Sequence, residues 1–269
     1  MENLKSGYLA SWLMIFLSLM YSISILAQHN EQHSSIRIMS YNIHYGIGMD
    51  DIYSLENIAN VIKKADPDLV GLQEIKDSLM TEELGKLTGM KAVFGPSLGT
   101  SKGYGDAILS KYPFESAGNL SIPSASPSRY QAMAVDVDFT HKSTSLGKIR
   151  LINTHFDWLS TIGSEQARLA TVDVIVQAFC NTTVLPTVLT GDFNSKPDSE
   201  LLKKFEKYGW INYQKGGPYK THNSTRPQYQ IDYILFKSNH RWKVKNNFVM
   251  YGEESSDHLP IVMDIIIRE

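Results

Sequence analysis

The segment from Thr187 to Asn194, TVLTGDFN, places a mostly apolar run directly before an aspartate, an aromatic ring and a carboxamide. The apolar part is typical of a buried β-strand. Unpaired Asp192 and Asn194 would be costly in the middle of such a strand, but at its end they can face a cleft. The segment therefore predicts a strand whose carboxyl end opens onto a polar site.

The same arrangement recurs along the chain. Any one such residue has an ordinary explanation, as a turn residue, a solvated helix start, or a surface or core histidine. Taken together, six apolar segments that each carry an acid, an amide or an imidazole near one end favour a shared cleft. Besides Asp192 and Asn194, the residues are Asn42, Glu74, His155 with Asp157, Asp232, and Asp257 with His258.

Strands and helices are mixed along one continuous run, without an internal linker, a low-complexity tract or a repeat. Hydrophobic periodicity predicts strands and helices. The strand predicted over 130–139 alternates between apolar and small or charged residues, so we expect it to be covered on one face. At 269 residues and 42% hydrophobic, the chain fits a single α/β domain with sheet packed on sheet and helices outside. The expected strands lie at 35–42, 68–73, 91–96, 106–111, 130–139, 148–156, 187–193, 229–236, 241–251 and 259–267, and the expected helices at 54–65, 81–89, 164–179 and 198–210.

The amino-terminal segment has the pattern of an export signal. Lys5 precedes an uncharged run from Ser6 to Gln28 that is rich in Leu, Ile and Met. We expect residues 1–27 to be this signal, cleaved after Ala27, with a linker over 28–35 and the catalytic domain over 36–269. The protein would then be exported, to the periplasm or the extracellular space. The length of the apolar run leaves an uncleaved membrane anchor open as the alternative.

Charge and cysteine content exclude some classes of protein. The formal net charge is −2, whereas a protein that grips long nucleic acid by its phosphates usually carries a basic excess. This lowers the expectation of a dedicated DNA binder but leaves a nuclease with a local basic patch open. Cys180 is the single cysteine, so there is no internal disulfide and no lipid-modified cysteine at a new N-terminus.

The types of side chain at the strand ends suit one kind of chemistry. Glu74 and Asn42 are oxygen ligands, and the sequence has no cluster of Cys or His at zinc spacing, so a hard cation such as Mg²⁺ is expected. Hydrolysis of a phosphoester needs such a cation, a base that activates water, and donors to the phosphate. Asp192 can serve as the base, Asn194 as a donor, and two histidines can supply charge or a proton.

The chain resembles the endonuclease/exonuclease/phosphatase superfamily, the Mg²⁺-dependent fold shared by DNase I-like nucleases, sphingomyelinases and inositol-phosphate phosphatases. Seven motifs stand in the family's order between Ile36 and Ile267: MSYNIH, DPDLVGLQEI, YGDAILS, INTHFD, TGDFNSKP, QIDYIL and SDHLPIV. The resemblance implies a four-layer α/β sandwich of two mostly antiparallel sheets flanked by helices. It also implies a metal-dependent hydrolase of phosphoric ester bonds that uses Mg²⁺, with Mn²⁺ as a possible substitute.

Roles follow from the resemblance position by position. Glu74 would be the main metal ligand, with Asn42 beside it and Asp257 near the metal. Asp192 would activate water, and Asn194 would hold the phosphate. His258 would contact the scissile phosphate, oriented by Asp232, and His155 would be the second histidine. Arg129 lies where relatives often carry a phosphate-contacting arginine, although a surface charge is an equal alternative.

Asp106 departs from many relatives, which carry an amide or an apolar residue there. Nucleases like DNase I place an acid near this point to pair with the histidine of the NTH motif. The resemblance therefore suggests a pair between Asp106 and His155, which would raise the pKa of the histidine.

Substrate must be argued from loops and charge. The loop over 213–229 interleaves aromatic and basic residues before Asp232 and is expected at the rim of the cleft, where it could stack a ring and hold a phosphate. Together with the net charge, this favours a compact substrate, such as a lipid headgroup or sugar phosphate. A secreted DNase I-like endonuclease or exonuclease is the alternative, and a non-catalytic binding module is disfavoured because no ligand or histidine is missing. We expect a monomer without an obligate protein partner. The loop residues are Tyr213, Lys215, Tyr219, Lys220, Arg226 and Tyr229.

Overall fold

The structure, a computed structural model, describes residues 14, 16–21, 35–97, 104–143 and 146–268. The expected export segment and linker therefore lie largely outside the described residues, although residues 16–21 are helical and Ser35 already belongs to a strand. Within the described part, none of the helices combines the length and the apolar character needed to cross a membrane.

The first of two six-stranded sheets is built from both ends of the domain. Its one parallel pair, β1 with β2, lies at the centre, and all other neighbours are antiparallel. In spatial order the strands are β11 (Arg241–Val249), β12 (Ile261–Arg268), β1 (Ser35–Asn42), β2 (Leu69–Ile75), β4 (Gly105–Ser110) and β3 (Lys91–Pro96).

The second sheet repeats this pattern with a contiguous stretch of chain. Its parallel pair, β7 with β8, is again central and is flanked on both sides by antiparallel neighbours. The spatial order is β5 (Phe114–Ile122), β6 (Tyr130–Asp138), β7 (Lys148–His155), β8 (Thr187–Asp192), β10 (Asp232–Lys237) and β9 (Trp210–Ile211).

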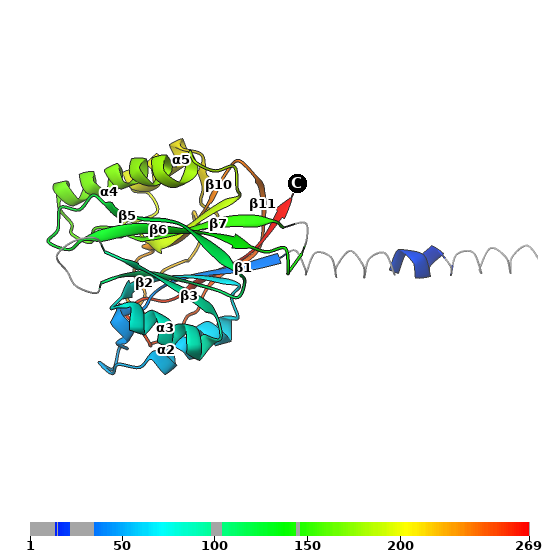
Figure 1. Cartoon of the computed structure of the whole chain (residues 1–269), viewed down its shortest axis with the longest axis horizontal. Coiled ribbons are helices and arrows are strands. Elements are labelled where there is room, and N and C mark those ends of the chain that lie inside the picture. Colours follow the sequence, from blue (N-terminus) through cyan, green and yellow to red (C-terminus); the bar gives the residue numbers. More distant parts are fainter. Residues whose placement is uncertain (1–13, 15, 22–34, 98–103, 144–145, 269) are drawn as a thin grey trace, which may run out of the picture.

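Helices cover the outer face of each sheet, and Figure 1 shows one helical layer on each side of the two sheets. The first sheet is covered by α2 (Leu55–Ala65) and α3 (Ser78–Thr88), and the second by α4 (Ile162–Ile175), which continues as the π-helix η2 (Val176–Cys180), and by α5 (Glu200–Lys207). Their starts are set by side chains that accept a hydrogen bond from the first turn. The capping residues are Ser54, Asp77, Thr161 and Ser199.

Three buried apolar clusters hold the four layers together. The central cluster lies between the sheets and joins residues such as Ile38 and Leu69 of the first sheet to Val135 and Leu151 of the second. The other two clusters lie under the helices of each side. Burial of apolar area of this kind is the dominant favourable contribution to folding. The predicted four-layer α/β sandwich of two mostly antiparallel sheets is therefore confirmed.

Two expectations about the second sheet were wrong. β6 is covered on both faces, because Ala132 and Ala134 pack toward the helices while Val135 and Val137 face the other sheet. The segment Phe114–Ile122 was not predicted as a strand, yet it forms β5 at the edge of the sheet. Its polar sequence and the bulge before Gly118 leave no clear alternation of apolar residues.

Candidate active site

The central parallel pair of each sheet brings its carboxyl ends to one polar centre. Asn42 is the last residue of β1 and Asp192 the last residue of β8, so they come from different sheets. The Asn42 Nδ2 atom donates to Glu74 Oε1 at 2.9 Å and to Asp192 Oδ2 at 3.1 Å. One buried amide thus ties the carboxylate of β2 to the carboxylate of β8 across the gap between the sheets.

Two of the predicted site residues, Glu74 and Asn194, have a left-handed backbone conformation. Glu74 has φ 58° and Asn194 has φ 48°, a region that few residues other than glycine adopt. The turn at Asn194 lets its amide nitrogen donate to Asp192 Oδ1 at 2.9 Å. The sequence predicted both side chains at strand ends, and the backbone there bends so that both line the same cavity.

His258 lies between two aspartates. Its Nδ1 atom is 2.9 Å from Asp232 Oδ2, and its Nε2 atom is 3.6 Å from Asp192 Oδ2. Burial alone would lower the pKa of the imidazole, but the charges of Asp232 and Asp192 and the hydrogen bond to Asp232 raise it to about 10. His258 is therefore held as a cation, with Nδ1–H directed at Asp232 and Nε2–H at the centre.

The second predicted histidine lies on the other side of Asp192. His155 Nε2 is 3.5 Å from Asp192 Oδ2 and 3.2 Å from the Asn194 side-chain nitrogen, which also donates to the Phe156 carbonyl at 3.0 Å. Burial and the charge of Asp232 raise the pKa of Asp192, whereas the two histidines lower it. The result is a carboxylate more basic than usual, placed between two imidazoles.

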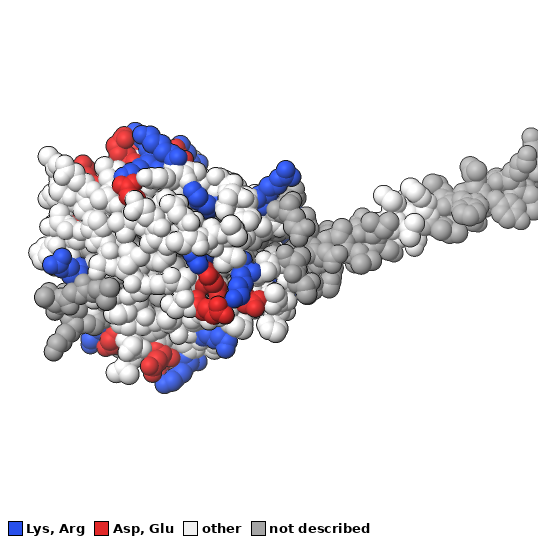
Figure 2. Space-filling model, turned by 45° about the horizontal axis from the view of Figure 1, so that its top comes forward, with Lys and Arg blue, Asp and Glu red and all other residues white. Residues whose placement is uncertain are grey.

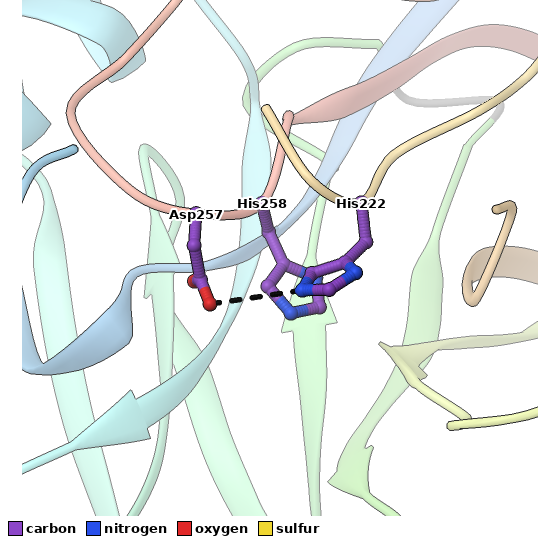
Figure 3. A group of neighbouring side chains, drawn as sticks. All are labelled: His222, Asp257 and His258. Atoms are coloured by element: carbon purple, nitrogen blue, oxygen red, sulfur yellow. Dashed lines mark ion pairs between the residues drawn. The ribbon is translucent and has the colours of Figure 1, made fainter. Parts of the chain in front are cut away.

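Asp257 is surrounded by histidines that the sequence analysis did not single out. Its Oδ2 atom is 3.8 Å from His222 Nε2 and its Oδ1 atom is 3.9 Å from His44 Nδ1. Figure 3 shows His222 and His258 side by side, with ring centroids 4.8 Å apart, and Asp257 facing them. Burial would raise the pKa of Asp257, but the interactions with His222, His258 and His44 lower it to about 2.

A signal for one of the missed histidines was present. His44 follows Asn42 by two residues, so the same strand end that presents the amide also delivers an imidazole. His222 had no such signal. It reaches the site because its loop forms a local β-bridge with Tyr229 and a second bridge with His258, which is a tertiary contact.

These side chains surround a cavity of about 650 Å³. Arg129 lines it, as expected if it contacts phosphate. The lining residues include predicted site residues and, in addition, four aromatic side chains. They include His44, Tyr45, Glu74, Tyr104, Asp106, Arg129, Tyr130, His155, Trp158, Asp192, Asn194, His222, Asp257 and His258.

The proposed pair of Asp106 with His155 is wrong. Asp106 is buried and lines the cavity, but these two described side chains form no ion pair, and its Oδ2 atom has no hydrogen-bond partner. Burial and the charges of Glu74 and Asp192 raise its pKa well above the usual range. His155 instead turns toward Asp192 and Asn194, because the end of β7 pairs with the end of β8.

The loop over 213–229 does not present its aromatic and basic side chains to the cavity, contrary to expectation. Tyr213 and Tyr219 pack against the core between the sheets, and Lys215 pairs with Glu206. Tyr229 lies under the ammonium of Lys196, 5.1 Å from it. His222 is the residue of this loop that lines the cavity.

The donor set fits a divalent metal ion. Four carboxylates, those of Glu74, Asp106, Asp192 and Asp257, line one cavity, and a buried oxygen of Asp106 lacks a partner. Such an accumulation of negative charge is what a hard cation neutralises. Two groups of three described residues also bring potential ligand atoms within 4.8 Å of one another: Asp192, Asp232 and His258, and His222, Asp257 and His258.

Comparison with known proteins gives the same picture. Residues 39–258 match the model of the Endonuclease/Exonuclease/phosphatase family. No curated protein matches the sequence. Similar solved structures include an endonuclease/exonuclease/phosphatase from Beutenbergia cavernae, with 20% identity, TM-score 0.71, and coverage of 87% of this chain and 72% of that one.

Two further solved structures are similar to this chain over most of its length. The human Nocturnin catalytic domain with bound sulfate shares 22% identity at TM-score 0.70 and covers 88% of this chain and 94% of its own. A mannosyl-6-phosphatase from Bacteroides thetaiotaomicron shares 18% identity at TM-score 0.65, with coverage of 86% and 99%. At these identities the likeness shows the shared fold.

Proposed function

Because the chain belongs to the Endonuclease/Exonuclease/phosphatase family, whose members hydrolyse phosphoester bonds, we propose that it is an exported, Mg²⁺-dependent phosphoesterase that acts on a compact substrate. The observation that carries the proposal is the cavity in which Asp192 lies between His155 and His258 and is tied through Asn42 to Glu74. This arrangement would supply a base, an imidazole donor in His258, a second imidazole in His155 and a carboxylate for a cation.

Glu74 and Asn42 would hold the cation, with Asp257 nearby. When bound, a divalent cation supplies neutralisation of charge on the phosphate and the leaving group. Asn42 currently places its side-chain nitrogen toward Glu74 and Asp192, and its oxygen accepts from the His44 amide. It therefore also orients the two carboxylates relative to each other.

Side chains of the protein would carry out the proton transfer and donate hydrogen bonds to the phosphate. Asp192, with its raised pKa, accepts the proton of the attacking water. His258, held as a cation by Asp232, donates from Nε2 to a phosphate oxygen as charge develops there. His155 and Asn194 lie on the opposite side of Asp192 and would position the phosphate there.

A compact substrate is supported by the charges around the cavity. Among its lining residues that the structure describes, Arg129 is the one arginine or lysine. A surface that follows duplex DNA places several cations along the phosphate backbone. Nuclease activity on long nucleic acid is the outcome that would contradict this preference.

The test is a panel of phosphoesters, each with Mg²⁺ and with excess chelator. It contains bis-nitrophenyl phosphate, a hexose 6-phosphate, phosphatidylinositol, sphingomyelin, RNA and plasmid DNA. Chelation should abolish hydrolysis, and Mg²⁺ or Mn²⁺ should restore it. Glu74→Gln keeps an acceptor for Asn42 but removes the charge, so it should lose at least about 10²-fold in turnover. Glu82→Gln, an exposed helix residue, is the matched control.

Export is supported by the uncharged run from Ser6 to Gln28. Expression of the full chain in a bacterial host, followed by cell fractionation and determination of the mature N-terminus, tests it. A soluble exported protein that begins at Gln28 is expected. A full-length chain retained in the membrane fraction would identify the segment as an anchor instead.

A further inference from the structure

Four aromatic side chains contribute to the lining of the cavity, and together we call them its aromatic wall. Tyr45, Tyr104, Tyr130 and Trp158 all line it, although they come from four separate segments of the chain. Tyr45 and Tyr104 meet edge to face, with ring centroids 5.0 Å apart. Phosphoester hydrolysis uses none of these rings as an acid, a base or a metal ligand, so their convergence calls for another explanation.

Trp158 is the most exposed of the four. Its exposed fraction is 57%, which is unusual for so large an apolar side chain, whereas Trp210 and Trp242 are buried. An exposed indole at the mouth of a polar cavity is suited to stacking on the face of a ring.

The main chain around Trp158 is held rigidly by its neighbours. The buried carboxylate of Asp157 accepts from the amides of Ala125 and Ser126 on one oxygen and from the amide of Leu159 on the other. The Arg168 Nη1 atom donates to the carbonyls of Asp157 and Leu159, at 2.7 Å and 3.0 Å. Trp158 is therefore presented from a fixed loop, which reduces the entropy lost when a ligand stacks on it.

Tyr45 is also held in a defined position. Both His44 and Tyr45 have left-handed backbone, with φ 45° and 55°. Burial raises the pKa of the Tyr45 phenol, and the negative charge of Glu74 nearby raises it further. Tyr45 thus connects the aromatic wall to the carboxylate centre, so a ligand can touch both at once.

We propose that Tyr104 and Trp158 form a stacking site for a ring on the alcohol side of the phosphoester. The shared chemistry is a sugar ring or a nucleobase attached to the scissile phosphate. The inference rests on the proposed function, since that function places the phosphate at Asp192 and His258. A single described cation, Arg129, together with an aromatic wall favours one phosphate with one ring over a chain of phosphates.

Kinetics on paired substrates test the stacking site. Ring-bearing esters are a hexose 6-phosphate, a nucleoside 5′-monophosphate and a dinucleoside monophosphate, and ringless esters are glycerol 3-phosphate and glycerophosphocholine. Trp158→Ala should raise KM for the ring-bearing esters by about tenfold or more and leave the ringless esters unchanged. Trp158→Phe should recover part of the loss. The hexose and nucleoside arms distinguish a sugar from a base.

Tyr229→Ala is the matched control, because Tyr229 and Tyr104 are both 45% exposed but Tyr229 does not line the cavity. Tyr104→Ala should raise KM selectively for ring-bearing esters, and Tyr229→Ala should not. Equal losses on ringless esters, or the same selective loss in Tyr229→Ala, would overturn the stacking site.

Tryptophan fluorescence separates this inference from the proposed activity. Trp158 is the exposed tryptophan of the described part of the chain, and Trp12 lies outside that part. In chelator, a nucleoside monophosphate or a hexose phosphate should quench the emission of the wild-type protein but not of Trp158→Phe. Quenching without hydrolysis would contradict the phosphoesterase alone. Hydrolysis of ring-bearing esters without quenching would contradict the stacking site alone.

Discussion

His258 illustrates how position decides the chemistry of a single residue. An isolated imidazole loses its proton near pH 6.5, yet here Asp232 holds Nδ1 and Asp192 lies near Nε2. The buried pair of carboxylates outweighs the cost of burying the cation. Consequently His258 should carry charge across the neutral range and lose it only as the pH rises through about 10.

This charge can be measured directly. In the metal-free protein, an NMR titration should show the His258 ring still protonated at pH 8. Asp232→Asn removes the closest raising charge, so the pKa of His258 should fall toward the ordinary value of about 6.5. His240, whose ring contacts a main-chain carbonyl instead of a carboxylate, serves as the internal reference. An ordinary pKa for His258 in the wild-type protein would contradict the assignment.

At the scale of single residues, the sequence predicted the carboxylates of the cavity and two of its histidines. Asn42, Glu74, His155, Asp192 and Asn194 were visible because each ends an apolar strand, and strand ends of this kind meet at one edge of a sheet. Sequence patterns did not reveal that one oxygen of Asp106 lacks a hydrogen-bond partner or that His222 faces Asp257, because both facts depend on tertiary contacts. Periodicity carries no information about such contacts.

Between the sheets, polar and small residues occupy a position that is usually apolar. Asn153 on β7 donates to the carbonyls of Leu72 and Ala107 on the first sheet, and its oxygen accepts from Gln73 and Thr190. Gly71 on β2 provides the room. A Cβ atom there would overlap Thr190 Oγ1 and lie 2.5 Å from Asn153 Oδ1. The two sheets are therefore fixed in register by a buried network beneath the cavity.

Gly71→Ala should disturb this network. The extra methyl group cannot fit without a shift of β2 or β7, so the free energy of unfolding should fall by about 1–3 kcal/mol. Urea denaturation followed by circular dichroism provides the measurement. Gly163→Ala is the control, because at the start of α4 its added methyl would lie 3.3 Å from the Ala125 methyl and 3.9 Å from Thr161 Oγ1, without overlap. If Gly71→Ala and the wild-type protein had the same free energy of unfolding, the added methyl would be accommodated without cost, which would contradict the prediction.

Helices and strands could be predicted from the sequence where their buried and exposed faces differ clearly in residue type. α2 was visible because Leu55, Ile58, Ala59 and Ile62 repeat at helical spacing and are buried together. β6 was predicted to be covered on one face because its alanines were not counted as apolar core residues. Ala132 and Ala134 in fact form a second buried face, which packs under the helices. Small residues permit a helix layer to approach a sheet closely, and a pattern that weighs only large apolar residues misses this.

At the scale of the whole molecule, opposite charges are interspersed over the face drawn in Figure 2. Figure 2 shows blue and red groups scattered over the visible face without a broad patch of either. Many basic side chains also form ion pairs with Asp or Glu. Because their charges are neutralised locally, little positive electrostatic potential remains to attract a polyanion. The pairs include Arg37 with Asp264, Lys111 with Asp66, Lys142 with Asp68, Lys148 with Glu115, and Lys204 with Asp173.

Salt dependence tests what this surface can bind. Hydrolysis of a small ester should change little between about 50 and 200 mM salt, because a single phosphate releases few counterions. An enzyme that neutralised six to ten phosphates of a duplex would lose about 10³–10⁵ in affinity over the same interval. Efficient nicking of plasmid DNA with a steep salt slope, and no gain on small esters, would identify a nuclease instead.

The position of β1 between β2 and β12 has a consequence for synthesis of the chain. Every strand of the second sheet lies within residues 114–237, so the ribosome delivers that sheet as one continuous block. β1 is among the first strands made, yet one of its edges waits for residues 261–268. Until then the unpaired main-chain groups of β1 can pair with an incorrect strand. Pairing of strands that are far apart in the sequence is also slow. His258 lies just before the strand that closes this edge, so we expect the proposed active site to be completed only in the same late step in which β12 pairs with β1.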